Sequence, residues 1–289
     1  MTDLTANTEA EVVEIVRSAR EWKSPLNIVG ARTKRAFGRA VANWGTALDL
    51  SGLKGVVSYE PEELLLTVLP GTPVVDINAL LAANNQRLGF EPADWGPLLG
   101  APANKATIGG VISANANGPA AIRFGRARDH LLGFRAVNGF GEAYKGGGKV
   151  VKNVTGFDLP KLMCGAMGTL GPLTELTFRV FPKHAEKIFV TASADGAVLR
   201  KVAASPLEAT ALIHSDGKAY VRLEGALDEK IAVLRQLGDF TEVETLPPPT
   251  LPAMPFPPES AARAALTRAV KAAFDPLGLF NPGRMYEGI

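Results

Sequence analysis

The chain has 289 residues, of which 46% are hydrophobic and 21% are charged, and its formal net charge is +2. This composition is typical of folded globular proteins and excludes the disordered and fibrous classes, and a charge so near zero does not indicate a nucleic-acid partner. The single cysteine, Cys164, excludes an intrachain disulfide framework and fits a reducing compartment.

Residues 1–182 alternate short helices, short strands and turns, which favours an α+β arrangement. The first helix is expected to begin after Thr8, because Thr8 and Glu11 have capping-box spacing and apolar residues recur at helical period up to Trp22. Strands are expected at 26–29, 47–50, 55–59, 64–69, 131–137 and 173–181, and a further helix at 74–84.

Residues 183–258 are expected to form a small second domain. Four strands and two helices between 187 and 246 follow the order βαββαβ of a ferredoxin-like unit, and Asp216 with Gly217 predicts a type I′ hairpin turn. Seven of the 21 prolines fall within 247–258, which predicts a stiff extended connector. A helix at 260–274 cannot bury an apolar face alone, so it should pack back on a discontinuous first domain, 1–182 plus 259–289.

The segment NVTGFDLPKLMCGAMGTLG, residues 153–171, contains four glycines. Asp158 is expected to cap a short helix that has Pro160 in its first turn and ends at Gly165. The last two glycines of the segment, Gly168 and Gly171, then turn the chain into the strand that begins at Leu173.

The common nucleotide-binding and catalytic motifs do not occur. Tyr144 stands where a Rossmann fingerprint beginning at Gly139 needs its third glycine, and Gly148-Lys149 lacks the Ser or Thr of a P-loop. The three histidines lie far apart in the sequence, so no metal site is expected and no residue is assigned a catalytic role.

No apolar run approaches the ~18 residues that a membrane span needs, and the acidic N-terminal segment is unlike a signal peptide. We expect a cytoplasmic protein, or one that its partners hold at a membrane.

Three glycine-rich segments suggest a long ligand lying across the first domain. GARTKRAF, which follows the strand at 26–29, can present successive N–H groups and the side chains of Thr33, Lys34 and Arg35 to an anion. Charge-assisted hydrogen bonds contribute roughly 1.5 to 3 kcal/mol each, so four or five would hold a pyrophosphate without a metal. The alternative for this segment is a basic surface turn. ATIGGVISANANG is expected to be a second glycine-lined loop, and residues 153–171 a third.

The order of these motifs resembles a known family. The segments that carry the resemblance are GARTKRAFGR, TVLPGTPVVDINALL, ATIGGVISANANG, VVKNVTGFDLPKLMCGAMGTLGPLTE and FDPLGLFNPGRMY. They resemble the FAD-binding domain of vanillyl-alcohol-oxidase type, also called PCMH type, and more narrowly the small FAD-binding subunits of bacterial glycolate oxidases. The resemblance covers 25–182 and 274–286, and it implies an α+β fold of two FAD-binding subdomains with 183–258 as a reduced cap domain.

The resemblance implies that FAD lies between the two subdomains, with its pyrophosphate on the first loop. It places the second loop along the ribityl chain and pyrophosphate, the turn at 168–173 near the adenine, and the C-terminal segment near the flavin ring. The residues implied, in that order, are Gly30, Ala31, Arg32, Thr33, Lys34 and Arg35; Pro102, Thr107, Gly109, Gly110, Ala114, Asn117 and Gly118; Gly168, Gly171 and Leu173; and Asn281.

The resemblance also implies an activity and partners. The chain would be the FAD-binding subunit of a glycolate or other 2-hydroxy acid oxidase complex, beside a larger FAD-binding catalytic subunit and an iron-sulfur subunit. Hydride would pass from the acid to the flavin, and electrons onward. No histidine or cysteine stands at the linkage positions of covalent members, so FAD should be bound non-covalently.

Several departures keep other functions open. Arg32 and Lys34 stand where the wider superfamily has glycine, and Pro172 lacks an N–H that could bind adenine. The cap is short and no histidine-rich segment is present, which fits a catalytically silent assembly or electron-relay subunit. Four arginines, Arg123, Arg126, Arg128 and Arg284, could meet a substrate carboxylate or the flavin phosphates, or be solvated or interface charges. A nucleic-acid binder using these arginines is disfavoured by the net charge.

Overall fold

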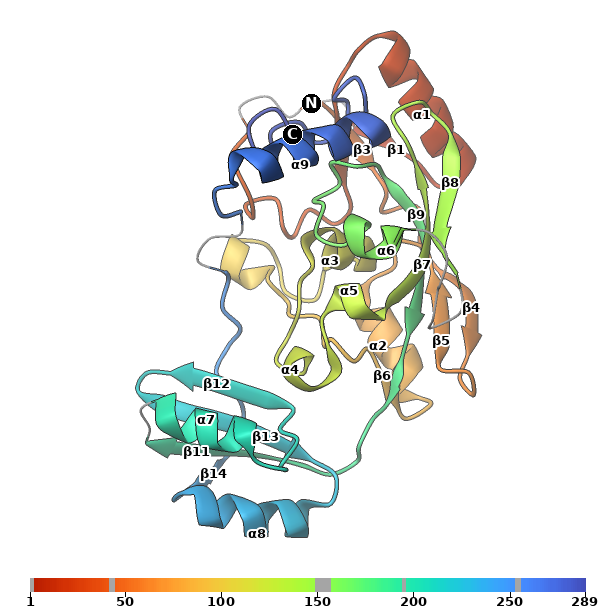
Figure 1. Cartoon of the computed structure of the whole chain (residues 1–289). Helices are drawn as coiled ribbons and strands as arrows, with labels where there is room; N and C mark the ends of the chain where they lie inside the picture. Colours follow the sequence, from red (N-terminus) through yellow and green to blue (C-terminus); the bar gives the residue numbers. More distant parts are fainter. Residues whose placement is uncertain (1–2, 42–44, 149–156, 194–195, 253–255) are drawn as a thin grey trace.

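The computed structural model describes residues 3–41, 45–148, 157–193, 196–252 and 256–289 (Figure 1). Two sheets form the larger part of the molecule: a parallel sheet in the order β1–β3–β2 and an antiparallel sheet in the order β4–β5–β9–β7–β8. The strands of the first are β1 (Asp3–Thr5), β2 (Leu26–Val29) and β3 (Thr46–Asp49). Those of the second are β4 (Val56–Glu60), β5 (Leu65–Val68), β7 (Leu131–Val137), β8 (Ala143–Gly147) and β9 (Leu173–Arg179).

Short helices lie around these sheets. They are α1 (Glu9–Glu21), α2 (Val74–Ala82), a 3-10 turn at Pro97–Leu99, α3 (Ile108–Ala114), α4 (Ala121–Phe124), α5 (Ala127–His130), α6 (Leu159–Met163) and α9 (Ala261–Phe274). Strands β6 (Gln86–Arg87) and β10 (Phe181–Pro182) form a separate antiparallel pair. Among the described residues, none of these helices is both long and apolar enough to cross a membrane.

Each of the two sheets has its own hydrophobic core. Val12, Val16 and Leu48 lie in the core between α1 and the parallel sheet, and Phe90, Ile112 and Phe178 in the core of the antiparallel sheet. Glu9 joins the two, because its carboxylate accepts hydrogen bonds from Arg135 on β7 and from Thr174 on β9. Glu9 therefore ties the two sheets together.

Residues 187–243 form the separate unit that the sequence predicts, here called the βαββαβ unit. Its antiparallel sheet has the order β12–β13–β11–β14, with one helix in each crossover. The elements are β11 (Lys187–Ser193), α7 (Gly196–Ala204), β12 (Ala211–Ser215), β13 (Lys218–Glu224), α8 (Leu227–Leu237) and β14 (Thr241–Val243). Asp216 and Gly217 have φ of 50° and 70°, as a type I′ turn requires. Figure 1 shows this unit at the end of the molecule opposite the chain termini.

Local signals placed most elements correctly, with informative exceptions. Thr8 accepts a hydrogen bond from the Glu11 N–H as predicted, but the Glu11 carboxylate accepts from the Asn7 N–H, so the cap is shifted by one residue. Strand β8 was not predicted, because its AYKGG sequence reads as a turn. Gly146 is needed there because a Cβ would press against the Phe134 ring.

Two further predictions concern the segment 153–171. Asp158 accepts a hydrogen bond from the Lys161 N–H at the start of α6, and Gly165 follows the helix with φ of 88°, so the predicted helix stop is confirmed. The first part of the motif, up to Gly156, lies outside the described residues.

Helix α9 packs back on the first part of the chain, as predicted, through a buried ion pair. Nζ of Lys271 lies 2.6 Å from a carboxylate oxygen of Asp275 and also donates to the carbonyl oxygens of Thr169 and Phe280. The Asp275 carboxylate in turn accepts the N–H groups of Leu279 and Phe280. This pair therefore holds together the end of α9, the turn at 168–173 and the C-terminal segment.

Removing the charge of Lys271 should destabilise the protein strongly. Lys271→Met leaves the fully buried Asp275 carboxylate without its cation, and breaking a buried pair typically costs about 3 to 5 kcal/mol. The free energy of unfolding from urea titration measures the loss. Arg268→Met on the exposed face of the same helix is the matched control and should change it by less than about 0.5 kcal/mol. Equal effects of the two variants would contradict the assigned role.

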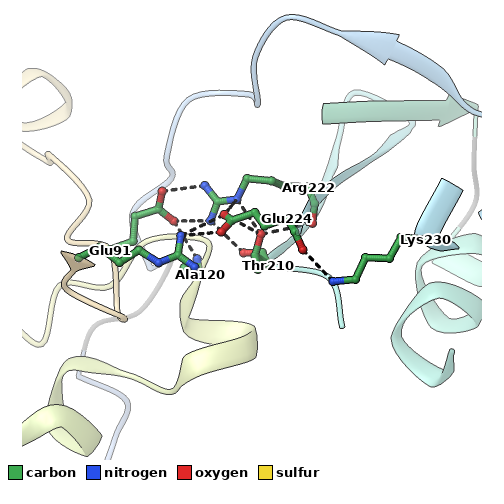
Figure 2. Close-up of polar contacts among 7 residues, drawn as sticks. Glu91, Ala120, Thr210, Arg222, Glu224 and Lys230 are labelled. Atoms are coloured by element: carbon green, nitrogen blue, oxygen red, sulfur yellow. Dashed lines mark hydrogen bonds and ion pairs between the residues drawn. The ribbon is translucent and has the colours of Figure 1, made fainter. Parts of the chain in front are cut away.

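The βαββαβ unit is joined to the rest of the molecule by a second buried ionic network (Figure 2). Both terminal nitrogens of Arg222 donate to the carboxylate of Glu91, at 2.7 and 2.6 Å, and its Nε lies 3.0 Å from Glu224. Arg87 on β6 also pairs with Glu224, at 2.8 Å. Burial acts to raise the pKa of Glu224, but Arg87, Arg222 and Thr210 outweigh it, and the pKa stays below its usual value.

Loss of Arg222 should weaken this junction more than loss of an exposed pair beside it. Arg222→Ala leaves Glu224, 4% exposed, with one cation fewer, and should lower the free energy of unfolding by about 3 kcal/mol. Arg123→Ala breaks the exposed Arg123–Glu208 pair across the same junction and should cost about 0.5 kcal/mol or less. Urea unfolding of both variants tests the difference, and a larger loss for Arg123→Ala would refute it.

Candidate functional site

The three glycine-rich segments meet in a groove between the parallel sheet and α3. We call it the loop groove; its walls are the segment 27–35, the residues 107–114 and the turn 167–173 with Asn281. It is narrow, enclosing about 100 Å³ beside 30–35 and about 80 Å³ beside 168–173. A space of this shape suits an extended ligand chain better than a ring system.

The segment after β2 presents hydrogen-bond donors that have no protein partner. Within the described part of the chain, the backbone N–H groups of residues 31–34 bond to no other residue. The Nζ atom of Lys34 and the Nδ2 atom of Asn27 are buried in the same wall and also lack partners among the described residues. Burial lowers the pKa of Lys34 to about 8, although Asp94 acts to raise it. Because unpartnered buried donors are costly, this wall is suited to an anion.

The backbone of Arg32 is part of this wall, but its guanidinium forms ion pairs with residues of the parallel sheet. Its φ is 61°, in the left-handed region that glycine adopts readily, which is why glycine is expected here from the resemblance. The guanidinium lies 2.8 Å from Asp3 and 3.4 Å from Asp49 on the parallel sheet. These carboxylates neutralise Arg32, whereas Lys34 has no carboxylate at ion-pairing distance among the described residues.

The second wall is a helix rather than the loop predicted from its glycines. Residues 108–114 form α3, and the Gly109-Gly110 pair lies in its first turn. A Cβ at Gly109 would lie 2.7 Å from Pro70, whereas one at Gly110 would meet only the Thr107 hydroxyl, at 3.4 Å. Gly109 is therefore required for packing, and Gly110 leaves space in the groove.

The third wall joins the turn 167–173 to the C-terminal segment. Asn281 accepts a hydrogen bond from the Ile28 N–H at 2.7 Å and donates to the carbonyl of Met167 at 2.6 Å. A Cβ at Gly168 would lie 2.6 Å from the Asn281 amide nitrogen, and one at Gly171 would collide with the carbonyl oxygen of Val137. These glycines are therefore needed to close the wall, whatever it binds.

Arg284 fixes the shape of the first wall. Its guanidinium donates to the carbonyl oxygens of Lys34, Arg35 and Arg39, at 3.0, 2.7 and 3.2 Å. Burial and the charge of Arg35 lower its pKa to about 10. Arg284 is thus a buried clamp on the loop, and neither a solvated charge nor a direct contact for a carboxylate.

Ala114 and Met167 line both the loop groove and a larger cavity of about 580 Å³, here called the chamber. One part of its wall is aromatic, with the rings of Phe37, Trp95 and Phe256 packed together. The polar side chains that line it are those of Asn115, Asn117, Arg126 and Thr250. The volume is in the range of small-molecule sites. No histidine, aspartate or glutamate is among the described residues that line it.

Most of the residues expected at a cofactor line the loop groove, with three exceptions. Pro102 is exposed and lies outside it, Asn117 lies in the chamber, and Gly118 lies in another pocket beside the βαββαβ unit. Gly118 is needed because a Cβ would collide with the carbonyl oxygen of Glu91.

Asn281 is also placed differently from expectation. The resemblance places it near the flavin ring and the turn at 168–173 near the adenine, whereas Asn281 lines the groove both beside 30–35 and beside 168–173. The cause is that the C-terminal segment runs beside β2, where Leu26 pairs with Phe280.

Sequence reasoning missed several residues of the site. Asn27 lies within a strand, and Ser113 and Met167 belong to patterns that read as ordinary helix and turn. Lys271 reads as an exposed helix lysine, although its spacing of four residues to Asp275 is a signal for an ion pair. Among the described residues no cluster of three or more metal-ligating side chains is found.

Comparisons with known proteins agree with this architecture. The model of the family described as FAD binding domain matches residues 3–147. The chain is 34% identical over 231 residues to glycolate oxidase subunit GlcE of Escherichia coli (strain K12), covering 78% of this chain and 63% of that protein. It is 31% identical over 179 residues to the mitochondrial D-lactate dehydrogenase (cytochrome) of Arabidopsis thaliana, covering 61% and 30%. The chain thus spans less than two thirds of the length of these curated relatives.

A solved structure shares the fold. Alkyldihydroxyacetonephosphate synthase superposes with a TM-score of 0.65 at 14% sequence identity, over 81% of this chain and 49% of that one.

Proposed function

The chain belongs to the FAD binding domain family, and from that premise we propose that it is the FAD-carrying subunit of an enzyme that oxidises glycolate or a related 2-hydroxy acid. The resemblance to small glycolate oxidase subunits supports a complex with a larger flavoprotein and an iron-sulfur subunit. The observation that carries the proposal is the buried Lys34 ammonium, which has no partner among the described residues and lies in the loop groove.

The residues of the loop groove fit FAD. A pyrophosphate is an extended anion, and the wall at 31–34 offers free N–H groups, the Lys34 ammonium and the Asn27 amide. Charge-assisted hydrogen bonds contribute roughly 1.5 to 3 kcal/mol each, so these donors are sufficient without a metal. The chamber would take the flavin ring, because its volume is in the range of small-molecule sites and three aromatic side chains line it.

When bound, FAD would accept a hydride from the hydroxyl-bearing carbon of the acid and pass the electrons onward. The chain itself would bind and orient the cofactor and exclude water through Phe37, Trp95 and Phe256. Cys164, the only cysteine, is a buried residue whose pKa burial raises to about 12, so a thiolate link to the flavin is disfavoured and binding would be non-covalent.

A second candidate function rests on the lining of the chamber. Oxidation of a hydroxyl group needs an acceptor for its proton, and no histidine, aspartate or glutamate among the described residues lines the chamber. The chain would then carry FAD as an assembly or electron-relay subunit, and a partner would supply the base.

FAD affinity should depend on Lys34 and on pH. Lys34 in the FAD-free protein loses its proton above about pH 8, and a bound pyrophosphate raises its pKa. Binding therefore takes up a proton above pH 8, and the Kd should rise by up to tenfold per pH unit there while staying flat below. Lys34→Met should weaken binding about tenfold at pH 7 and remove the rise. Fluorescence titration of the apoprotein with FAD measures both.

The control for that titration is Lys105→Met, which removes an exposed lysine two residues before Thr107 and should leave the Kd unchanged. Acid precipitation should release all flavin into the supernatant, and retained flavin would contradict non-covalent binding. A correctly folded chain that takes up no FAD at any pH would refute the proposed function.

Reduction by substrate separates the two candidate functions. Anaerobic glycolate should bleach the flavin absorbance of the FAD-loaded chain alone if the chain is itself catalytic. Bleaching that appears only after the larger flavoprotein subunit is added would favour the relay function. The control is propionate, which has the carboxylate but no hydroxyl group to oxidise and should leave the absorbance unchanged in either case.

A further inference from the structure

The chamber carries one positive charge and no negative one among its described lining residues. That charge is Arg126, and the other polar groups are two asparagines and a threonine. Arg126 is exposed, so its guanidinium is accessible to a ligand that enters the chamber. The chamber therefore offers an anion one cation and no opposing carboxylate among its described lining residues.

Arg126 is distinguished from the other candidate arginines by its environment. Arg123 pairs with Glu208, Arg284 is bonded to backbone carbonyls, and Arg128 does not line the chamber. The guanidinium of Arg126 makes no ion pair within the described ranges of the chain. The nearest acid in sequence, Asp129, accepts a hydrogen bond from the backbone N–H of Arg126 instead.

Neighbouring residues hold Arg126 in place. The side-chain Oδ1 of Asn117 accepts the N–H of Ala127, the residue after Arg126, at 2.6 Å, and the side-chain Nδ2 of Asn117 donates to the backbone carbonyl of Asn115. These bonds tie the start of α5 to the end of α3. The backbone of Arg126 is thereby fixed at the chamber before any ligand arrives, which reduces the entropy that binding would cost.

We propose that Arg126 binds the carboxylate group of a small organic acid in the chamber. The inference rests on the proposed function and deepens it, because it assigns the acid to this subunit rather than to a partner. A guanidinium presents two parallel N–H donors that match the two oxygens of a carboxylate, and this pairing orients the acid as well as attracting it.

Oxalate tests the proposal, because it carries carboxylates and has no hydroxyl-bearing carbon to oxidise. Isothermal titration of the FAD-loaded chain should show oxalate binding, and Arg126→Gln should weaken it ten- to a hundredfold, the range expected for a charge-assisted pair. Arg126→Lys should recover part of the loss, since it keeps the charge but not the paired donors. Arg123→Gln, three residues earlier and outside the chamber, should bind oxalate as the wild type does.

FAD content, measured from flavin absorbance, should be the same in all four proteins and shows that the variants fold. Full FAD content without oxalate binding in the wild type would overturn the inference and leave the proposed function standing. Unchanged oxalate affinity in Arg126→Gln would also overturn the inference and leave the proposed function standing. A wild-type chain that takes up no FAD would refute the proposed function, and the inference would fail with it.

Discussion

The loop groove depends on one segment, residues 271–284, which supplies polar side chains to the backbone of its walls. Irregular backbone that is buried must find hydrogen-bond partners, and each group left without one costs about 1 to 3 kcal/mol. Lys271 satisfies the turn at Thr169, Asn281 joins β2 to Met167, and Arg284 binds the carbonyls after β2. One stretch of chain therefore holds walls that are far apart in the sequence.

This arrangement separates the donors that build the groove from those that remain for a ligand. Arg32 and Arg284 are both cationic, yet one is neutralised by Asp3 and Asp49 and the other is bonded to carbonyl oxygens. Lys34 and Asn27 keep buried donors without partners among the described residues. The charge available to an anion in the groove is thus that of Lys34, one of the 31 lysines and arginines of the chain. The net charge of the chain therefore does not reveal it.

The glycines, which first suggested a ligand cradle, are mostly structural. Gly109 packs on Pro70, Gly118 on the backbone of Glu91, and Gly168 and Gly171 close the third wall. Gly110 differs from these four, because a Cβ added there would meet only the hydroxyl of Thr107. The ion pair between Arg222 and Glu91 also helps to position the site. Glu91 begins the segment that contains Asp94, which acts on the charge of Lys34, and Trp95, which lines the chamber.

The sequence by itself determined most local elements and the βαββαβ order. Those features depend on caps, periodicity and turn residues within a few positions, such as Asp158 at α6 and Asp216-Gly217 in the hairpin. Only the tertiary structure decided that Asn27 and Arg284 line the loop groove, that Pro102 and Gly118 do not, and that Asn281 lies beside Gly168. These placements arise from contacts across more than a hundred residues, because the C-terminal segment pairs beside β2, and no local pattern encodes that pairing.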